Sequence, residues 1–122
     1  MSASAYQMYK RTQVSTASQG DLLLMLFDGA VKFARQGREL IERKEYAAAN
    51  EKLQRTQNIV SELISSLNLD TGQIAQDLYQ LYRYIHERLV QANIKKDLAQ
   101  LDEAIQMLDD FRDTWRQVVY KT

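Results

Sequence analysis

The sequence has no cysteine and no proline, and only four of its 122 residues are glycine. Without cysteine, neither a disulfide nor a thiolate metal site can form, and a reducing cytoplasm is the expected compartment. Without proline, long uninterrupted helices are allowed, and no proline-rich linker divides the chain. We therefore expect a single domain built from long helices.

Neither sign of charge is in excess, because sixteen basic residues balance sixteen acidic ones. This balance argues against a surface that binds the phosphates of a nucleic acid. The longest apolar run, Leu22 to Phe27, is far shorter than the ~20 residues that cross a bilayer. The opening residues MSASAYQMYKR lack the apolar core of a secretory signal. We expect no nucleic-acid partner, no membrane insertion and a cytoplasmic location.

Four stretches carry apolar residues at the spacing of a helix. The expected helices run from about Ser18 to Arg43, from Tyr46 to Leu67, from Asp70 to about Lys96, and from Asp97 to the end. Short connections make successive helices antiparallel. The sequence therefore predicts an all-α fold, an antiparallel up-down-up-down four-helix bundle over residues 18–122 with an N-terminal arm over residues 1–17.

Polar residues mark the expected helix ends. Asn68 is expected in the left-handed conformation that closes a helix, and the first turn is placed near Arg43 to Tyr46. Capping-box spacing marks two helix starts, at Asp70 with Gln73 and at Asp97 with Gln100.

The third helix carries two neighbouring apolar lines. We assign its buried stripe to Ile74, Leu78, Leu81, Ile85, Leu89 and Ala92. The flank beside this stripe carries Tyr79, Tyr82, His86 and Val90. On the fourth helix, we expect Trp115 to be buried against the first and third helices.

No catalytic or metal-binding constellation can be read from the sequence. A di-metal site in a bundle core needs Glu-x-x-His pairs on two helices. This chain has one histidine, His86, and Arg83 stands three residues before it. There is no glycine-rich phosphate loop, and no serine or threonine has a readable histidine-and-acid arrangement. We expect no enzyme, no metal and no cofactor.

His86 leaves one alternative function open. Histidine phosphotransfer domains are also helical bundles, with an exposed histidine followed by lysine and glycine at the third and fourth positions. Here Leu89 and Val90 stand at those positions. A histidine phosphotransfer-type bundle centred on His86 therefore rests on the fold alone.

The apolar surface of the four helices exceeds what one bundle core needs. Surplus apolar stripes on helices most often receive another amphipathic helix. We expect a groove at the edges of the core, lined by Ile59, Leu63, Tyr79, Tyr82, Val90 and Met107. The N-terminal arm carries the apolar and aromatic residues Tyr6, Met8, Tyr9 and Val14. An arm of this composition gains by lying across such a groove.

Two motifs give the chain a family resemblance. The stretch TASQGDLLLMLFDGAVKF, from Thr16 to Phe33, and the stretch FRDTW, from Phe111 to Trp115, are similar to the signatures of the flagellin export chaperones, the FliS family. Gln19 stands where the family usually has proline, and Asp21 stands where it often has glutamate. The resemblance extends over nearly the whole chain.

The resemblance implies both a function and a partner. Members of this family are four-helix bundles that bind the disordered C-terminal segment of flagellin in the cytoplasm. Binding prevents premature polymerisation and delivers flagellin to the flagellar type III export apparatus. The resemblance also implies an N-terminal arm that moves when cargo binds. Other flagellar export components are further expected partners.

A third reading is a self-associating structural bundle, whose surplus apolar flanks pair with those of a second copy. A weak homodimer is compatible with the chaperone reading as well.

Overall fold

The computed structural model describes residues 19–121. Four α-helices and one short 3₁₀ helix run through them: α2 (Gln19–Glu42), α3 (Tyr46–Ser65), η1 (Leu69–Thr71), α4 (Gln73–Lys95) and α5 (Leu98–Lys121). No strand occurs in this range. The predicted all-α bundle of four long helices is confirmed, while the predicted arm, with Tyr6, Met8, Tyr9 and Val14, lies outside the described residues.

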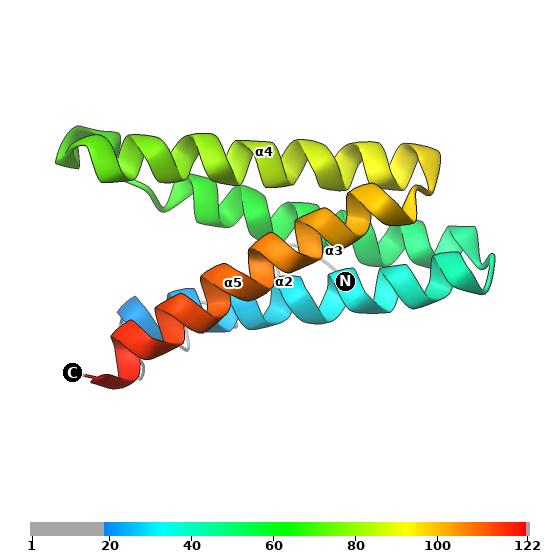
Figure 1. Ribbon diagram of the computed structural model, residues 1–122, viewed down its shortest axis with the longest axis horizontal. Coiled ribbons are helices and arrows are strands. Elements are labelled where there is room, and N and C mark those ends of the chain that lie inside the picture. Colours follow the sequence, from blue (N-terminus) through cyan, green and yellow to red (C-terminus); the bar gives the residue numbers. More distant parts are fainter. Residues whose placement is uncertain (1–18, 122) are drawn as a thin grey trace.

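The helices form a closed ring in which each contacts two others. Helix α2 packs against α3 and α5, and α4 packs against the same two helices. Figure 1 shows that α5 crosses this ring diagonally. Its first turns lie next to the end of α4, whereas its last turns lie next to the start of α2. The end of α5 and the start of α4 therefore diverge.

The core lies between the four helices and is mostly aliphatic. Its largest fully buried side chains include Leu53, Leu63, Ile85, Leu89, Leu101 and Leu108. One end of the core is aromatic: the Tyr82 ring lies edge-on to Phe111 at 5.4 Å and to Phe27 at 6.1 Å between centroids. Burial raises the pKa of the Tyr82 phenol to about 12. Three helices therefore meet through aromatic rings at this end.

The turn between α2 and α3 closes without glycine. Lys44 has a φ of 61°, its N–H donates to the Ile41 carbonyl, and the Glu45 N–H donates to the Leu40 carbonyl. This is the Schellman arrangement, in which a left-handed residue satisfies the last carbonyls of a helix. The predicted turn near Arg43 to Tyr46 is confirmed.

The connection between α3 and α4 differs from the prediction. Asn68 is extended, with a φ of −101°, and its side chain accepts a hydrogen bond from the Asp70 N–H. It therefore caps η1 instead of closing α3. Gly72 precedes α4 with no side-chain cap, so the capping box at Asp70 and Gln73 is wrong. The short 3₁₀ turn places Gln73 inside the helix, where it cannot act on Asp70.

Asp97 is the N-cap of α5, as expected. Its Oδ1 accepts hydrogen bonds from the backbone N–H groups of Ala99 and Gln100, at 2.9 and 3.3 Å. The Gln100 side chain donates to Asp97 Oδ2 at 3.0 Å. These hydrogen bonds lower the pKa of Asp97, and the one from the Gln100 side chain has the largest effect.

The expected buried stripe of α4 is partly wrong. Ile74 is 78% exposed and Leu81 is 41% exposed, whereas Ala75 and Tyr82 are buried. The helix presents two neighbouring apolar lines, and the line through Tyr82 meets the rings of Phe27 and Phe111. Ile74 and Leu81 lie on the other line, toward the divergent end of α5.

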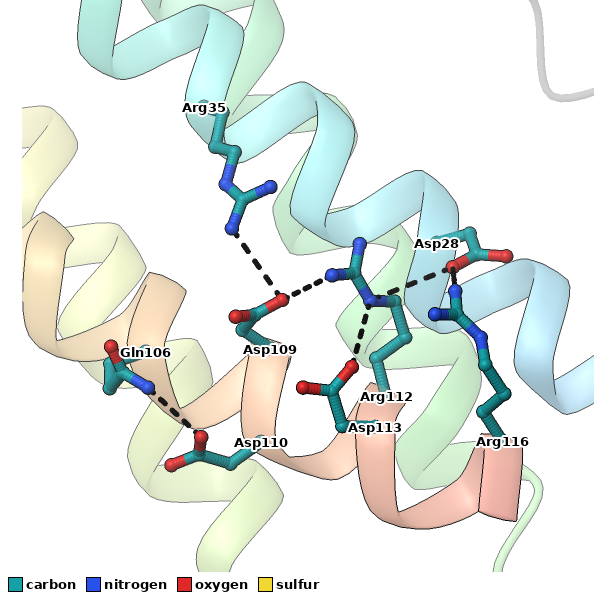
Figure 2. Close-up of polar contacts among 8 residues, drawn as sticks. All are labelled: Asp28, Arg35, Gln106, Asp109, Asp110, Arg112, Asp113 and Arg116. Carbon is teal, nitrogen blue, oxygen red and sulfur yellow. Dashed lines mark hydrogen bonds and ion pairs between the residues drawn. The ribbon is translucent and has the colours of Figure 1, made fainter. Parts of the chain in front are cut away.

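Ion pairs join α2 and α5 along their length, and Figure 2 shows the group around Arg112. Asp28 accepts from Arg116 at 3.3 Å and lies 3.8 Å from Arg112 Nε. Farther along, Asp109 lies 3.5 Å from Arg35 and also contacts Arg112. Exposed pairs stabilise a protein by only about 0–1 kcal/mol each. As a network they define how α5 lies along α2.

Candidate functional site

Helix α4 carries most of the large apolar side chains that the structure leaves exposed. Ile74, Leu81, Tyr84 and Ile94 all belong to it, with exposed fractions from 41% to 78%. Leu69, on η1 just before α4, is also exposed. Single exposed apolar residues are ordinary, but a concentration on one helix indicates an interaction surface.

One group of these residues lies where α4 and α5 diverge. Ile74, Leu78 and Leu81 follow one another at helical spacing on α4; Ile74 and Leu81 are exposed, and Leu78 is half-buried against the core. Tyr84, three residues after Leu81, contacts Glu103 Oε2 on α5 at 2.7 Å through its hydroxyl, so this flank of α4 lies toward α5.

Helix α5 adds two apolar side chains that are not fully buried. Met107 lies one turn after Glu103 and is half-buried against the core, and Val118 is 49% exposed. We call Ile74, Leu78, Leu81, Met107 and Val118 the α4/α5 apolar surface. Beyond Phe111, Trp115 and Arg116 of α5 donate hydrogen bonds to α2. The start of α4 and the end of α5 diverge (Figure 1), and Ile74, Leu81 and Val118 are exposed.

A hollow of about 680 Å³ borders another flank of α4. The described residues that line it are Tyr79, Gln80, Arg83, Tyr84, His86, Glu87 and Val90. We call this feature the α4 hollow. It combines two aromatic rings and a valine with charged groups, so it can take a chain segment that is apolar on one side and polar on the other.

Arg83 and His86 set the electrostatics of the α4 hollow. The Arg83 Nη1 donates to the Tyr79 hydroxyl at 3.1 Å, and its guanidinium lies 5.7 Å from the Tyr79 ring centroid. Burial lowers the pKa of His86, and the positive charge of Arg83 lowers it further. His86 is therefore neutral at pH 7, and Arg83 carries the positive charge at this end of the hollow.

The structure places the predicted groove residues in three different environments. Tyr79 and Val90 line the α4 hollow, and Met107 belongs to the α4/α5 apolar surface. Ile59, Leu63 and Tyr82 are buried in the core, with exposed fractions of 8%, 1% and 7%. Their expected place at the edge of the core is wrong, because Ile59 packs toward α2 at Gly29 and Tyr82 packs on Phe27. Which residues contact a partner stays a prediction.

The sequence reasoning missed the exposed residues of α4. Periodicity assigns Ile74 and Leu81 to the core and gives no place to Tyr84 and Ile94. The available signal was the surplus itself, since α4 has more apolar positions than one buried line can hold. Periodicity identified the surplus but not which line faces outward.

Within residues 19–121, no three His, Cys, Asp or Glu side chains are grouped so that they could hold a metal ion. None of the described helices is long and apolar enough to span a membrane.

Comparisons with known proteins identify the family. The family described as "Flagellar protein FliS" matches residues 2–122. The "Flagellar secretion chaperone FliS" of Bacillus subtilis (strain 168) is 40% identical over 114 residues, covering 93% of this chain and 85% of that protein. The protein of the same name from Salmonella typhimurium is 32% identical over 114 residues, covering 92% of this chain and 84% of that protein.

A solved structure supports the fold. A protein described as a "flagellar chaperone from bacteria" superposes with a TM-score of 0.78 at 21% identity, covering 98% of both chains. The relatives are named as chaperones, which is a non-enzymatic role, and this agrees with the expectation of no enzyme. The chain belongs to the FliS family of flagellar secretion chaperones.

Proposed function

We propose that this chain is a cytoplasmic export chaperone specific for flagellin. It binds the disordered C-terminal segment of flagellin, prevents premature polymerisation and delivers the subunit to the flagellar type III export apparatus. The names of its relatives and the two sequence motifs support this function. The structural observation that carries the proposal is the exposed apolar surface of α4, above all Ile74 and Leu81.

The physical reasoning is that an exposed apolar helix face favours a second amphipathic helix. The partner lays its apolar residues on the surface and keeps its polar residues in water. A disordered segment pays its ordering entropy when it binds, so it needs a wide surface for adequate affinity. The α4/α5 apolar surface and the α4 hollow lie on different flanks of one helix, and together they offer such a width.

Light scattering and calorimetry test the proposal directly. When the purified C-terminal segment of flagellin is added, the mass of the complex should rise by one segment per chain. Flagellin lacking that segment is the control and should not bind. The bound chaperone should also delay filament growth from purified flagellin, because the segment is held away from other subunits.

The alternatives predict different results. A chain that shows no mass increase with the segment, yet forms a stable dimer, is a self-associating structural bundle. Transfer of radioactive phosphate to His86 would indicate the phosphotransfer alternative. Co-purification with other export components would extend the list of partners without changing the proposed cargo.

A further inference from the structure

Arg83 is set apart from the other arginines in the described part of the chain. Arg35, Arg38, Arg43, Arg55, Arg88, Arg112 and Arg116 each form an ion pair with an aspartate or glutamate. Within residues 19–121, Arg83 has no carboxylate partner, and its guanidinium donates a hydrogen bond to the Tyr79 hydroxyl.

The surroundings of Arg83 do not neutralise its charge. Glu87 stands one turn later and lines the same hollow, but its carboxylate pairs with Arg88 at 2.8 Å. His86 lines the same hollow, but an imidazole is either neutral or positive, so it cannot neutralise Arg83. Arg83 is therefore a surface cation that has no carboxylate partner within residues 19–121, although the chain is rich in carboxylates.

The guanidinium of Arg83 is also held in place. Its position over the Tyr79 ring, at 5.7 Å from the centroid, and its hydrogen bond to the Tyr79 hydroxyl restrict the side chain. A guanidinium has five N–H donors in a rigid fork, and the bond to Tyr79 occupies only the Nη1 group. The remaining donors match the two oxygens of a carboxylate.

We infer that Arg83 recognises a carboxylate side chain of the bound cargo segment, and that the segment lies in the α4 hollow with apolar residues beside this acid. The inference rests on the proposed function and names the chemistry of the cargo at this point. Tyr79 and Val90 supply apolar contact next to Arg83. The matching cargo element is an amphipathic segment with Asp or Glu one helical turn from an apolar anchor.

A carboxylate fits better than a phosphate. Among the described lining residues Arg83 is the cation without a carboxylate partner, because Glu87 is paired with Arg88. A carboxylate with one negative charge balances Arg83, whereas a doubly charged phosphate would leave negative charge uncompensated beside Glu87.

The test is calorimetric binding of the C-terminal flagellin segment to the full chain and to Arg83→Gln. We expect affinity to fall about tenfold, because a hydrogen-bonded charge is lost, and the salt dependence of binding to become weaker. Arg83→Lys keeps the charge without the fork, so it should restore the affinity only in part. Circular dichroism should show unchanged helix content, because Arg83 is exposed.

Matched controls separate this pair from general electrostatics. Arg43→Gln removes another exposed arginine, one paired with Glu39 at the end of α2, and should leave affinity within twofold. The acidic residues of the flagellin segment can be changed to amides one at a time. One of these changes should weaken binding to the unmodified chain but have no effect on binding to Arg83→Gln.

Two outcomes would overturn the inference, and they are distinguishable. If the unmodified chain binds the segment and Arg83→Gln binds it equally well, Arg83 has no recognition role while the proposed function stands. If the unmodified chain does not bind the segment, the proposed function fails and the inference fails with it.

Discussion

The indole Nε1 of Trp115 donates a hydrogen bond of 2.9 Å to the backbone carbonyl of Gly20. These residues are 95 positions apart and belong to the two stretches that resemble the FliS signatures. A second contact joins the same stretches, where Asp28 pairs with Arg112, and Asp28 also pairs with Arg116, directly after the second stretch (Figure 2). The two motifs therefore meet in space and hold the end of α5 on the start of α2.

The first prediction concerns this hydrogen bond. Trp115→Phe keeps an aromatic ring but removes the N–H donor, so it should lower the free energy of unfolding by about 1 kcal/mol. Urea denaturation followed by circular dichroism measures the change, since Trp115 is the only tryptophan. Arg116→Gln is a control at an exposed site, with an expected effect below about 0.5 kcal/mol. Equal stability of Trp115→Phe and the parent would show that the bond contributes nothing.

The half-burial of Trp115 also corrects the sequence expectation. It packs against the core and contacts α2 at Gly20, but it is not fully enclosed by α2 and α4. The reason is the diagonal path of α5, which takes its last turns away from α4 (Figure 1). Periodicity places Trp115 on the inner face and cannot show that the neighbouring helix has diverged.

The second prediction compares two glycines in α2. A Cβ on Gly37 would lie 2.7 Å from Leu53 Cδ2 and 2.9 Å from its Cγ, whereas a Cβ on Gly29 would lie 3.3 Å from the terminal Ile59 Cδ1. Leu53 is fully buried and cannot retreat. Gly37→Ala should therefore destabilise the fold by about 1–3 kcal/mol through overpacking. Gly29→Ala should be neutral or stabilising, because alanine is about 1 kcal/mol better than glycine within a helix.

Thermal unfolding of both variants provides the measurement. A lower midpoint for Gly37→Ala alone would confirm that Gly37 is the point of close approach between α2 and α3. Similar midpoints for both variants would mean that the two helices separate enough to admit a methyl group.

The success of sequence reasoning differed between elements. The four helices and the turn at Lys44 follow from periodicity and length, because each long helix must bury an apolar face. The exposed line of α4 could not be predicted in this way. Ile74 and Ala75, like Leu81 and Tyr82, are adjacent positions, and the choice between them depends on the rings of Phe27 and Phe111 across the core. Sequence spacing does not contain that information.

The third prediction concerns pH. His86 has its pKa lowered from 6.5 by burial and by Arg83, so folding favours the neutral imidazole. Its contribution to stability is complete above the unfolded pKa and is lost as the pH falls through the folded pKa. The free energy of unfolding should decrease as the pH falls below 6.5, and His86→Gln should remove part of this decrease.

Nuclear magnetic resonance of the single histidine tests the cause of the shift. In Arg83→Gln the pKa of His86 should rise toward 6.5, because a nearby positive charge has been removed. Arg43→Gln should leave that pKa unchanged. If the pKa of His86 is unaltered in Arg83→Gln, burial alone causes the shift.

The fourth prediction locates cargo on the α4/α5 apolar surface. Ile74 is 78% exposed, so Ile74→Ser should change stability by less than about 0.5 kcal/mol. It should nevertheless weaken binding of the flagellin segment severalfold, because apolar contact is lost. Ile94→Ser, also on α4 and 70% exposed, is the matched control and should bind normally. Equal losses for both variants would contradict the assignment of cargo to the divergent end of α4 and α5.

The fifth prediction concerns the N-terminal arm, which lies outside the described residues. Its Tyr6, Met8 and Tyr9 are expected to cover apolar surface on the bundle when no cargo is present. One fully buried aromatic contributes on the order of 1.5–3 kcal/mol. Cargo that competes for the same surface must displace the arm, so its apparent affinity falls about tenfold or more, since ~1.4 kcal/mol is a factor of ten.

Deleting residues 1–12 should therefore uncover this surface. A hydrophobic dye should bind more strongly, and light scattering should show greater self-association of the free chain. If the arm only competes, the truncated chain should bind the flagellin segment more tightly. If Tyr6 and Tyr9 also contact cargo, the truncation should weaken binding even though the dye binds more strongly. Unchanged dye binding together with unchanged affinity would contradict both roles, because an arm that covers nothing and touches no cargo cannot alter either measurement.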